Sequence, residues 1–461
     1  MLPIDEVNNC LHQRPEPPFD RRPPRLLGIF LAWRLRAYSG AVAVVYAFVF
    51  SQLYRFGGWL VNSSGAAIYT DFSTCWVAGV QALQGEVSPL YDPAEFLKIQ
   101  SALLGAQEFF YPNWPYPPTF SLIMAPFALL PYFWSFVTWT SITLLGCIVV
   151  VYLIVRRSPA IPLVLASPFT LWNILAGQNG FLTASLLGAS LLFLERQPVL
   201  AGVFIGCLTY KPQFGILLPV ALAAAKQWRA VASAAATAAL LAGASVAAFG
   251  VSAWEAFPRG LFQQFGVVLK AEGLPDSVAT WGYLQTVYGL IRYLHGGAAL
   301  AWLGQGITAL CAAIIVWFVW RSPTRYALKA ALLSTAALLA SPYAFAYDMA
   351  AVAIPVAFLA RDQMRCGLLR GEQITLLGLF CVILALLVIF RDPPGGIPFG
   401  CLPGIGPAVL IVLLSIMLRR VLVSSGGGEL SLLKPTAFLS ITGRRLKFRK
   451  KFSETTFLPN D

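Results

Sequence analysis

Charged residues are scarce in this sequence. Only 11% of the 461 residues are charged and 58% are hydrophobic, whereas roughly a quarter of the residues are charged in an average soluble protein. The mean hydropathy is +0.70. This composition excludes a soluble globular protein and predicts an all-α integral membrane protein with one large membrane domain.

Metal ligands and phosphate-binding loops are also scarce. The chain has only two histidines, His12 and His295, and its eight cysteines include no CxxC pair, which leaves little room for a structural zinc site. There is no glycine-rich loop followed by lysine, no dinucleotide fingerprint and no GxSxG elbow. We therefore predict no cofactor and no bound nucleotide, and expect an activated substrate to arrive through the membrane.

The formal charge of +13 does not indicate a nucleic-acid partner, because the lysines and arginines gather in the tails and short loops. That distribution sets orientation in a membrane and predicts both termini in the cytoplasm of a bacterial-type cell, with the protein in its plasma membrane. Residues 1–36 read as a disordered basic, proline-rich arm. Residues 423–461 form a basic tail that we expect to bind anionic lipids.

Between these tails, residues 37–422 are predicted to form a bundle of about 10–12 transmembrane helices. Two large outer loops, about 55–117 and 251–297, interrupt it and carry amphipathic helices that lie at the interface. Strict alternation of twelve segments, with 197–225 as one span, places Arg156, Arg157 and Arg196 outside, against the usual bias. The predicted segments are 37–54, 118–131, 132–155, 159–176, 178–194, 197–225, 230–250, 298–320, 327–341, 343–360, 373–390 and 404–418, of which 118–131, 327–341 and 404–418 are short enough to be re-entrant.

Asp71 begins a short amphipathic segment in the first outer loop. Phe72, Trp76, Val80 and Leu83 recur at spacings of four and three, which predicts one apolar face of a helix lying on the membrane surface. Such a helix would hold the carboxylate at the water–lipid boundary. A capping role competes with a chemical one, because Asp is a favoured N-cap residue and the helix dipole favours negative charge there.

Other polar residues interrupt the apolar segments. Lys211 is an ionisable group within segment 197–225 and is a functional candidate by default, with a structural ion pair as the alternative. Asp348 follows Tyr347 near the outer end of a helix, where it could contact a sugar or pair internally. Tyr116 precedes two prolines that set the direction of the next helix. Gly177-Gln178-Asn179 reads as a structural turn between two segments.

Over roughly residues 40–225 the chain resembles the polytopic glycosyltransferases of the GT-C superfamily, and most closely glycosyltransferase family 87. The resemblance implies a GT-C-like bundle, a polyprenyl-phosphate-sugar donor, often of mannose, and a lipid or glycan acceptor on the outer face. It rests on Asp71-Phe72, Trp76, Ala78-Gly79, Leu83, Gly85, Leu90-Tyr91-Asp92, Tyr116-Pro117-Pro118, Leu130-Pro131, Gly177-Gln178-Asn179, Ala201-Gly202, Gly206 and Lys211-Pro212-Gln213.

In the superfamily an acidic residue of the first outer loop acts as the base, and Asp71 matches that position. Many relatives carry a paired acidic motif there, whereas Phe72 follows Asp71 here, so a bound metal is doubtful. The expected reaction is inverting transfer of a hexose. The residues that we expect to bind substrate or the leaving phosphate are Lys211, Gln213, Arg259, Lys270, Arg292, His295, Tyr116 and Asp348.

Two other functions fit the same sequence. A transporter or flippase of lipid-linked sugars would need an aqueous path lined with ionisable residues, and apart from Lys211 few lie within the segments. A polymerase or ligase that uses a pyrophosphate-linked oligosaccharide would also need large outer loops.

Overall fold

The computed structural model describes residues 26–62, 67–68, 70–105, 114–156, 164–270, 283–389 and 404–424. Most of the predicted N-terminal arm and nearly all of the C-terminal tail lie outside these residues. The described chain is helical apart from turns and isolated β-bridges, so the predicted all-α membrane fold is confirmed. Within these ranges, four helices are long and apolar enough to span a bilayer by themselves: α6 (Tyr132–Val155), α12 (Trp228–Phe249), α16 (Ala298–Arg321) and α20 (Ile405–Ser424).

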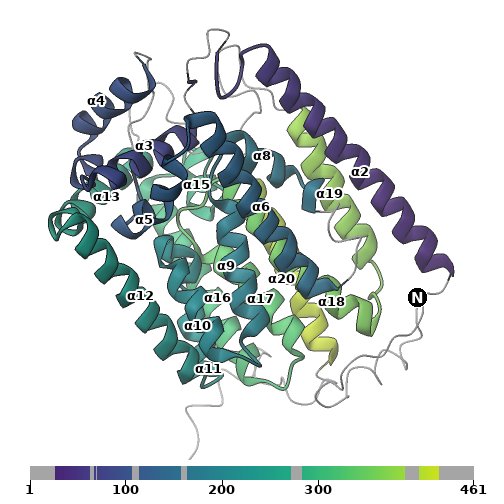
Figure 1. The fold of residues 1–461 in the computed structure, drawn as a ribbon. Helices are drawn as coiled ribbons and strands as arrows, with labels where there is room; N and C mark the ends of the chain where they lie inside the picture. Colours follow the sequence, from purple (N-terminus) through teal and green to yellow (C-terminus); the bar gives the residue numbers. More distant parts are fainter. Residues whose placement is uncertain are drawn as a thin grey trace, which may run out of the picture.

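Short helices gather at one end of the bundle, which we call the Asp71 end (Figure 1). The long helix α2 (Leu26–Arg55) lies at the edge of the bundle and leads into this end. Hydrogen bonds and close contacts join the short helices there; for example, Gly260 of α13 packs against Tyr91. The helices that gather at the Asp71 end are α3 (Asp71–Gln84), η1 (Ser88–Tyr91), α4 (Pro93–Leu104), α5 (Pro118–Ala128), α13 (Ser252–Lys270) and α15 (Val287–Tyr293).

Helix α5 does not cross the bundle. It packs along α3, where a Cβ on Gly79 would lie 2.7 Å from the carbonyl oxygen of Met124. Beyond its end, Trp76 donates a hydrogen bond to the carbonyl of Leu130 at 3.1 Å. The eleven residues of α5 span only about 16 Å as a helix, which is too short to cross the hydrocarbon core of a bilayer. This agrees with the prediction that 118–131 is short enough to be re-entrant.

Helices α8 (Pro168–Ala176) and α9 (Gly180–Phe193) form a hairpin whose turn lies at the Asp71 end. The next segment, predicted as one span over 197–225, is instead a re-entrant hairpin. Its first arm, α10 (Pro198–Cys207), runs parallel to the first half of α12, with Ser233 donating to the carbonyl of Val199 at 2.7 Å and Gly206 packed against Thr237. Short turns η2 (Leu208–Tyr210) and η3 (Pro212–Gly215) form the tip, and α11 (Leu218–Ala224) returns.

The physical reason is the Lys211-Pro212 pair. Proline has no N–H to continue a helical ladder, and a lysine inside an apolar run needs a partner. Small residues in α10 also allow close packing, because a Cβ on Gly202 would lie 2.5 Å from the carbonyl oxygen of Ala230. Hydropathy recognises an apolar run but cannot show where it turns back.

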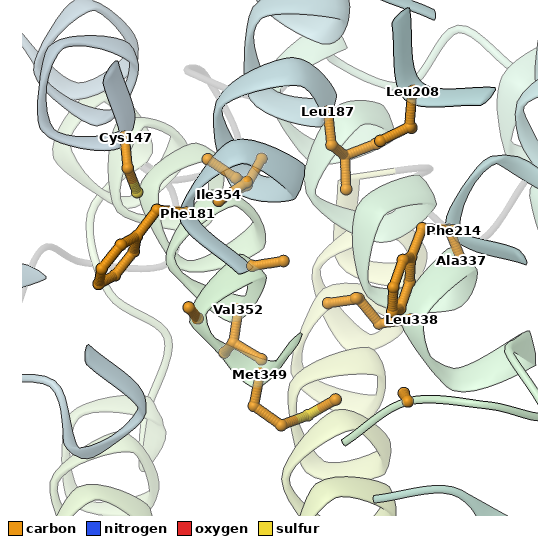
Figure 2. Close-up of a cluster of buried hydrophobic side chains, with 14 of the residues drawn as sticks. Cys147, Phe181, Leu187, Leu208, Phe214, Ala337, Leu338, Met349, Val352 and Ile354 are labelled. Atoms are coloured by element: carbon orange, nitrogen blue, oxygen red, sulfur yellow. The ribbon is translucent and has the colours of Figure 1, made fainter. Parts of the chain in front are cut away.

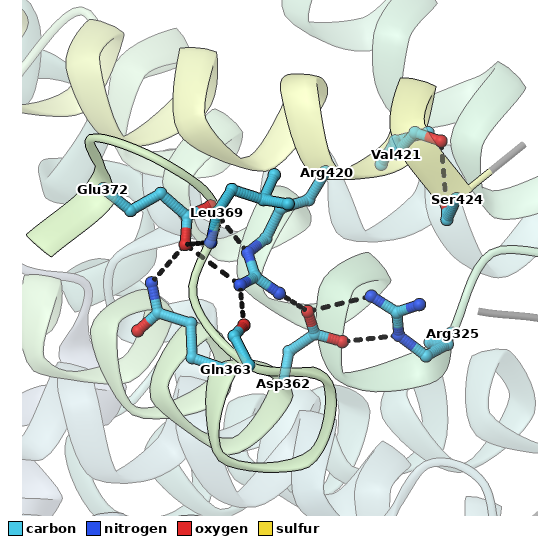
Figure 3. Close-up of polar contacts among 9 residues, drawn as sticks. Arg325, Asp362, Gln363, Leu369, Glu372, Arg420, Val421 and Ser424 are labelled. Atoms are coloured by element: carbon cyan, nitrogen blue, oxygen red, sulfur yellow. Dashed lines mark hydrogen bonds and ion pairs between the residues drawn. The ribbon is translucent and has the colours of Figure 1, made fainter. Parts of the chain in front are cut away.

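The remaining helices are α16, α17 (Tyr326–Ala340), η4 (Ala346–Val352), α18 (Ala353–Cys366), α19 (Glu372–Ile389) and α20. At the end opposite Asp71, Arg420 of α20 contacts Asp362 of α18 at 2.6 Å and Glu372 of α19 at 2.8 Å. Arg325, which precedes α17, contacts Asp362 at 2.7 Å. Figure 3 shows this network, which joins four helices at what we call the Arg420 end.

A buried apolar cluster supports the tip of the re-entrant hairpin (Figure 2). Leu208 and Phe214, on either side of Lys211, are buried together with Met349 of η4 and Phe181 of α9. Packing of this kind leaves little freedom for the tip to shift. It therefore fixes the position of Lys211 relative to η4 and α9.

The path of α5 also changes the predicted sidedness of two arginines. Arg156 closes α6 and Arg196 follows α9, and both lie at the Arg420 end rather than with Asp71. Their predicted outer position came from counting 118–131 as a crossing, whereas α5 does not cross the bundle. Arg157 lies outside the described residues.

Candidate functional site

Asp71 is the first residue of α3 and its side chain is partly exposed. The N-cap is Thr70, which has the extended backbone of that position. The side chain of Asp71 itself hydrogen-bonds with Gln178. The alternative that Asp71 serves as the N-cap is therefore wrong, although its place in the first turn still favours a negative charge.

The face of α3 that carries Asp71 points into the protein. Cys75, Ala78 and Ala82 follow Asp71 at helical spacing and are buried, whereas Leu83 of the predicted apolar stripe is 48% exposed. Along the predicted stripe Phe72 is buried, Trp76 and Val80 are half-buried and Leu83 is exposed, so its placement on a membrane surface stays a prediction. Small residues accompany Phe72 on the packed side of α3 because α5 approaches closely there.

The turn Gly177-Gln178-Asn179-Gly180 between α8 and α9 lies between two carboxylate-bearing elements. A Cβ on Gly177 would lie 2.5 Å from the Cβ of Phe72, the neighbour of Asp71. A Cβ on Gly180 would lie 2.2 Å from the carbonyl oxygen of Tyr347, the neighbour of Asp348. Gly177 also adopts a φ of +64°, which favours glycine. The two glycines therefore let the turn contact α3 and η4 at once.

Gln178 connects Asp71 to Tyr116. Its carboxamide hydrogen-bonds with the Asp71 side chain, and its Oε1 accepts a hydrogen bond from the Tyr116 hydroxyl at 3.0 Å. Gln178 and Tyr116 are both buried. Residues that are 107 positions apart in the sequence, from 71 to 178, thus form one hydrogen-bonded chain.

Lys211 and Asp348 form a buried ion pair beside this chain. The Lys211 Nζ lies 2.5 Å from Asp348 Oδ1, and the two side chains are 4% and 1% exposed. The rings of Tyr116, Phe214 and Tyr347 surround the ammonium at 5.7, 5.6 and 5.1 Å from their centroids. Asp348 Oδ2 also accepts from the backbone N–H of Phe345 at 3.0 Å. The internal pairing that the sequence left open for both residues is observed.

The pKa of Asp71 is raised to about 6, chiefly because burial disfavours the carboxylate and to a smaller extent because Asp348 repels it. The Gln178 hydrogen bond and the Lys211 charge lower the pKa in part. A carboxylate with a pKa near 6 is a stronger base than an ordinary aspartate and is still mostly ionised at neutral pH. The site can therefore accept a proton.

Unpartnered polar groups surround the same turn. The carboxamide of Asn179 is buried and has the Tyr116 hydroxyl as its hydrogen-bonding neighbour, but neither its oxygen nor its nitrogen makes a closer hydrogen bond within the described residues. In the same part of the structure Asn173 Nδ2 has no partner. Such groups carry a desolvation cost of about 1–3 kcal/mol each, which a hydroxylated ligand could offset.

The remaining predicted residues lie elsewhere. Gln213 is half-buried in η3, Arg259 is exposed on α13, and His295 is exposed just after α15. Arg292 is buried in α15 and donates to the carbonyl of Gly296 at 3.2 Å. Lys270 is the last residue of α13. Phosphate binding by these residues stays a prediction.

Sequence reasoning missed Gln178 and Asn179, which it treated as a structural turn. A signal was present, since two carboxamides between two glycines occur where two apolar segments meet. Within the described residues, no group of three His, Cys, Asp or Glu side chains is placed to hold a metal ion.

The sequence profile of glycosyltransferase family 87 matches residues 114–342. This range contains Tyr116, Gln178, Asn179 and Lys211, whereas Asp71 precedes it. No curated protein and no solved structure shows significant similarity to the chain.

Proposed function

The chain belongs to glycosyltransferase family 87, which makes it a membrane glycosyltransferase, and from this we propose that Asp71 is the general base of hexosyl transfer. We propose a polyprenyl-phosphate hexose, mannose in the first instance, as the donor. The acceptor is a lipid or glycan hydroxyl at the extracytoplasmic face of a bacterial-type plasma membrane.

One observation carries this proposal. Asp71 is a partly exposed carboxylate with a pKa of about 6, placed where residues of four other segments, Tyr116, Gln178, Lys211 and Asp348, come together. Perturbed carboxylates in such clusters are candidate catalytic groups. A structural aspartate would instead accept hydrogen bonds from backbone N–H groups, as Asp92 Oδ1 accepts from Ala94 and Glu95.

The reaction balances with one base. The acceptor hydroxyl loses its proton to an Asp71 oxygen while its own oxygen attacks the anomeric carbon. The bond from that carbon to the donor phosphate oxygen breaks, and polyprenyl phosphate leaves from the opposite face with the electron pair, which inverts the anomeric centre. General-base assistance of this kind is worth about 10²- to 10⁴-fold in rate.

The leaving phosphate needs positive charge or hydrogen-bond donors near it. Lys211 is poorly suited to direct contact, because it is buried, paired with Asp348 and surrounded by rings. Its nearby charge instead favours ionisation of Asp71. The exposed Arg259 and His295 can meet a lipid headgroup phosphate without such rearrangement, and we assign the phosphate to them first.

Charge supports the proposed orientation. Lysines and arginines concentrate at the Arg420 end, as expected for a cytoplasmic face: Arg156, Arg196, Lys226, Arg229, Arg321, Arg325, Lys329, Arg361, Arg365, Arg370, Arg419 and Arg420. The Asp71 end has fewer: Arg55, Lys98, Arg259, Lys270 and Arg292. We therefore propose that the Asp71 end is extracytoplasmic and that both termini are cytoplasmic.

A transfer assay tests the proposal. Purified protein in lipid vesicles is incubated with radiolabelled polyprenyl-phosphate mannose and crude membrane acceptors, and the labelled product is counted. Wild type is expected to transfer label and Asp71→Asn to lose at least 100-fold of the rate, the lower bound for a general base.

Asp92→Asn is the matched control. It makes the same substitution in the same outer segment, but Asp92 caps α4 by accepting from Ala94 and Glu95 at 2.9 and 3.1 Å. Its variant should transfer label normally, because Asn also serves as an N-cap. Transfer that survives Asp71→Asn would remove Asp71 from the base role, and label that only changes leaflet would identify a flippase.

A further inference from the structure

The carboxamide of Gln178 has hydrogen-bonding partners at both ends: Asp71 at one end, and at the other end the Tyr116 hydroxyl together with a longer contact from the backbone N–H of Asn179 at 3.4 Å. An ionised Asp71 can only accept hydrogen bonds, so Gln178 must present its Nε2–H to that carboxylate. The Oε1 is then left for Tyr116, at 3.0 Å, which must act as the donor. The order of donors is therefore fixed from Tyr116 through Gln178 to Asp71.

Both residues are held in place for this arrangement. The backbone N–H of Gln178 donates to the carbonyl of Asn173 at 3.3 Å, and the backbone N–H of Gly180 donates to Asn173 Oδ1 at 2.9 Å. Burial raises the pKa of the Tyr116 hydroxyl well above its ordinary value, so it keeps its proton over the working pH range. The backbone carbonyl of Tyr116 in turn accepts from the Tyr91 hydroxyl at 2.9 Å.

From these contacts we propose that Gln178 is a positioning residue, which orients the Asp71 carboxylate toward the acceptor hydroxyl and is itself oriented by Tyr116. This inference rests on the proposed function of Asp71 as the base. Without Gln178, Asp71 would lose its donor in a buried site and would hold its own proton at higher pH.

The charges that face Asp71 set the background for this effect. Lys211 favours its ionisation and Asp348 opposes it. The other titratable groups around it are the Cys75 thiol and the hydroxyls of Tyr116 and Tyr347, which are neutral at working pH. None of them changes charge between pH 5 and 8 in the ordinary course, so Asp71 dominates titration of the site in that range.

The test is the pH dependence of kcat/KM for transfer in vesicles, which reports the free enzyme. On the acidic side of this profile, kcat/KM falls as Asp71 becomes protonated, and we call this fall the acidic limb. Gln178→Leu removes the hydrogen-bond donor to Asp71 and should move the acidic limb to higher pH by roughly half to one pH unit. Gln178→Glu keeps the shape but adds a like charge, and should move the limb further in the same direction. Tyr116→Phe leaves Gln178 Oε1 only the longer contact from the backbone N–H of Asn179 at 3.4 Å, so the carboxamide is held less firmly and a smaller upward shift is expected.

Gln81→Leu is the matched control. Gln81 is also a buried glutamine near Asp71 in sequence, but its Nε2 donates to Gln84 at 3.1 Å. Its variant should leave the acidic limb in place. If Gln178→Leu only lowers the rate equally at every pH, or if Tyr116→Phe folds and leaves the limb unmoved, the positioning role is refuted.

A second measurement needs no transfer activity. The difference in unfolding stability between the Asp71→Asn variant and the protein that keeps Asp71 is measured as a function of pH. It is measured once with Gln178 present and once with Gln178→Leu in both proteins. The difference should begin near pH 4 in both backgrounds, but in the Gln178→Leu background it should reach its full value at a higher pH and be larger; an unchanged profile overturns the inference. If Asp71→Asn still transfers label but the stability profile shifts with Gln178→Leu, the proposed function of Asp71 is refuted while the contact between Gln178 and Asp71 stands.

Discussion

Replacing Asp71 by Asn should stabilise the protein at neutral pH while abolishing its transfer activity. The folded-state pKa of about 6, against an ordinary value of 3.8, means that burial opposes the carboxylate. Each tenfold change in proton affinity corresponds to about 1.4 kcal/mol, so the ionised side chain costs about 3 kcal/mol of stability at pH 7 as an upper bound.

The sign follows from proton binding. Between about pH 4 and 6 the folded protein holds the proton more tightly than the unfolded chain, so stability falls as the pH rises through this window. Asn carries no charge and escapes this loss. The advantage of Asp71→Asn should therefore be negligible near pH 4 and complete above about pH 6.5.

Thermal unfolding in detergent, measured from pH 4 to 8, checks this expectation. An advantage of about 3 kcal/mol corresponds to several degrees in Tm for a chain of this size. Asp92→Asn, at a cap that keeps its hydrogen bonds, should show no such pH-dependent gain. An Asp71→Asn variant that is less stable than wild type at pH 7, or whose difference does not vary with pH, would refute the reasoning.

Three further outcomes follow from the site. Gly177→Ala should lower both activity and Tm, since its Cβ would lie 2.5 Å from a neighbouring Cβ at a φ of +64°, whereas Gly243→Ala, with nothing within 4 Å, should match wild type in both measurements. Lys211→Met should destabilise the protein by about 3–5 kcal/mol, because it leaves a buried charge unpaired, and adding Asp348→Asn should recover part of the lost Tm; an additive loss would argue against the pair. Asn179→Leu should leave the Tm nearly unchanged, because it gives up only the contact with the Tyr116 hydroxyl, yet raise the KM for the donor or acceptor; a clear Tm drop without a KM change would make Asn179 structural.

The sequence predicted much of the site because its chemistry is unusual for its surroundings. Lys211 and Asp348 stand out as ionisable residues within apolar stretches, and the structure joins them at 2.5 Å. Asp71 was marked by its place after the first apolar segment. These signals are local, so they can be read from a few neighbouring residues.

The rest depends on contacts that the sequence does not encode locally. Gln178 contributes through partners 62 and 107 positions away, and a neutral carboxamide carries no charge to mark it. The buried part of α3 includes the small residues Cys75, Ala78 and Ala82 as well as Phe72, and a search for large apolar residues passes over the small ones. Hydropathy likewise counted residues 118–131 and 197–225 as crossings, because it measures composition and not the path of the chain.

The turn at Lys211-Pro212 also bears on how the chain is first threaded into a bilayer. With leucine at both positions, residues 198–225 would become a continuous apolar run long enough to cross as one helix. Every later segment would then cross the membrane in the opposite direction, which would place the arginines of the Arg420 end outside the cytoplasm, against the usual bias. These two substitutions, one removing a charge and the other a helix breaker, would thus invert the half of the chain that follows, so this pair sets the direction of insertion as well as the geometry of the finished protein.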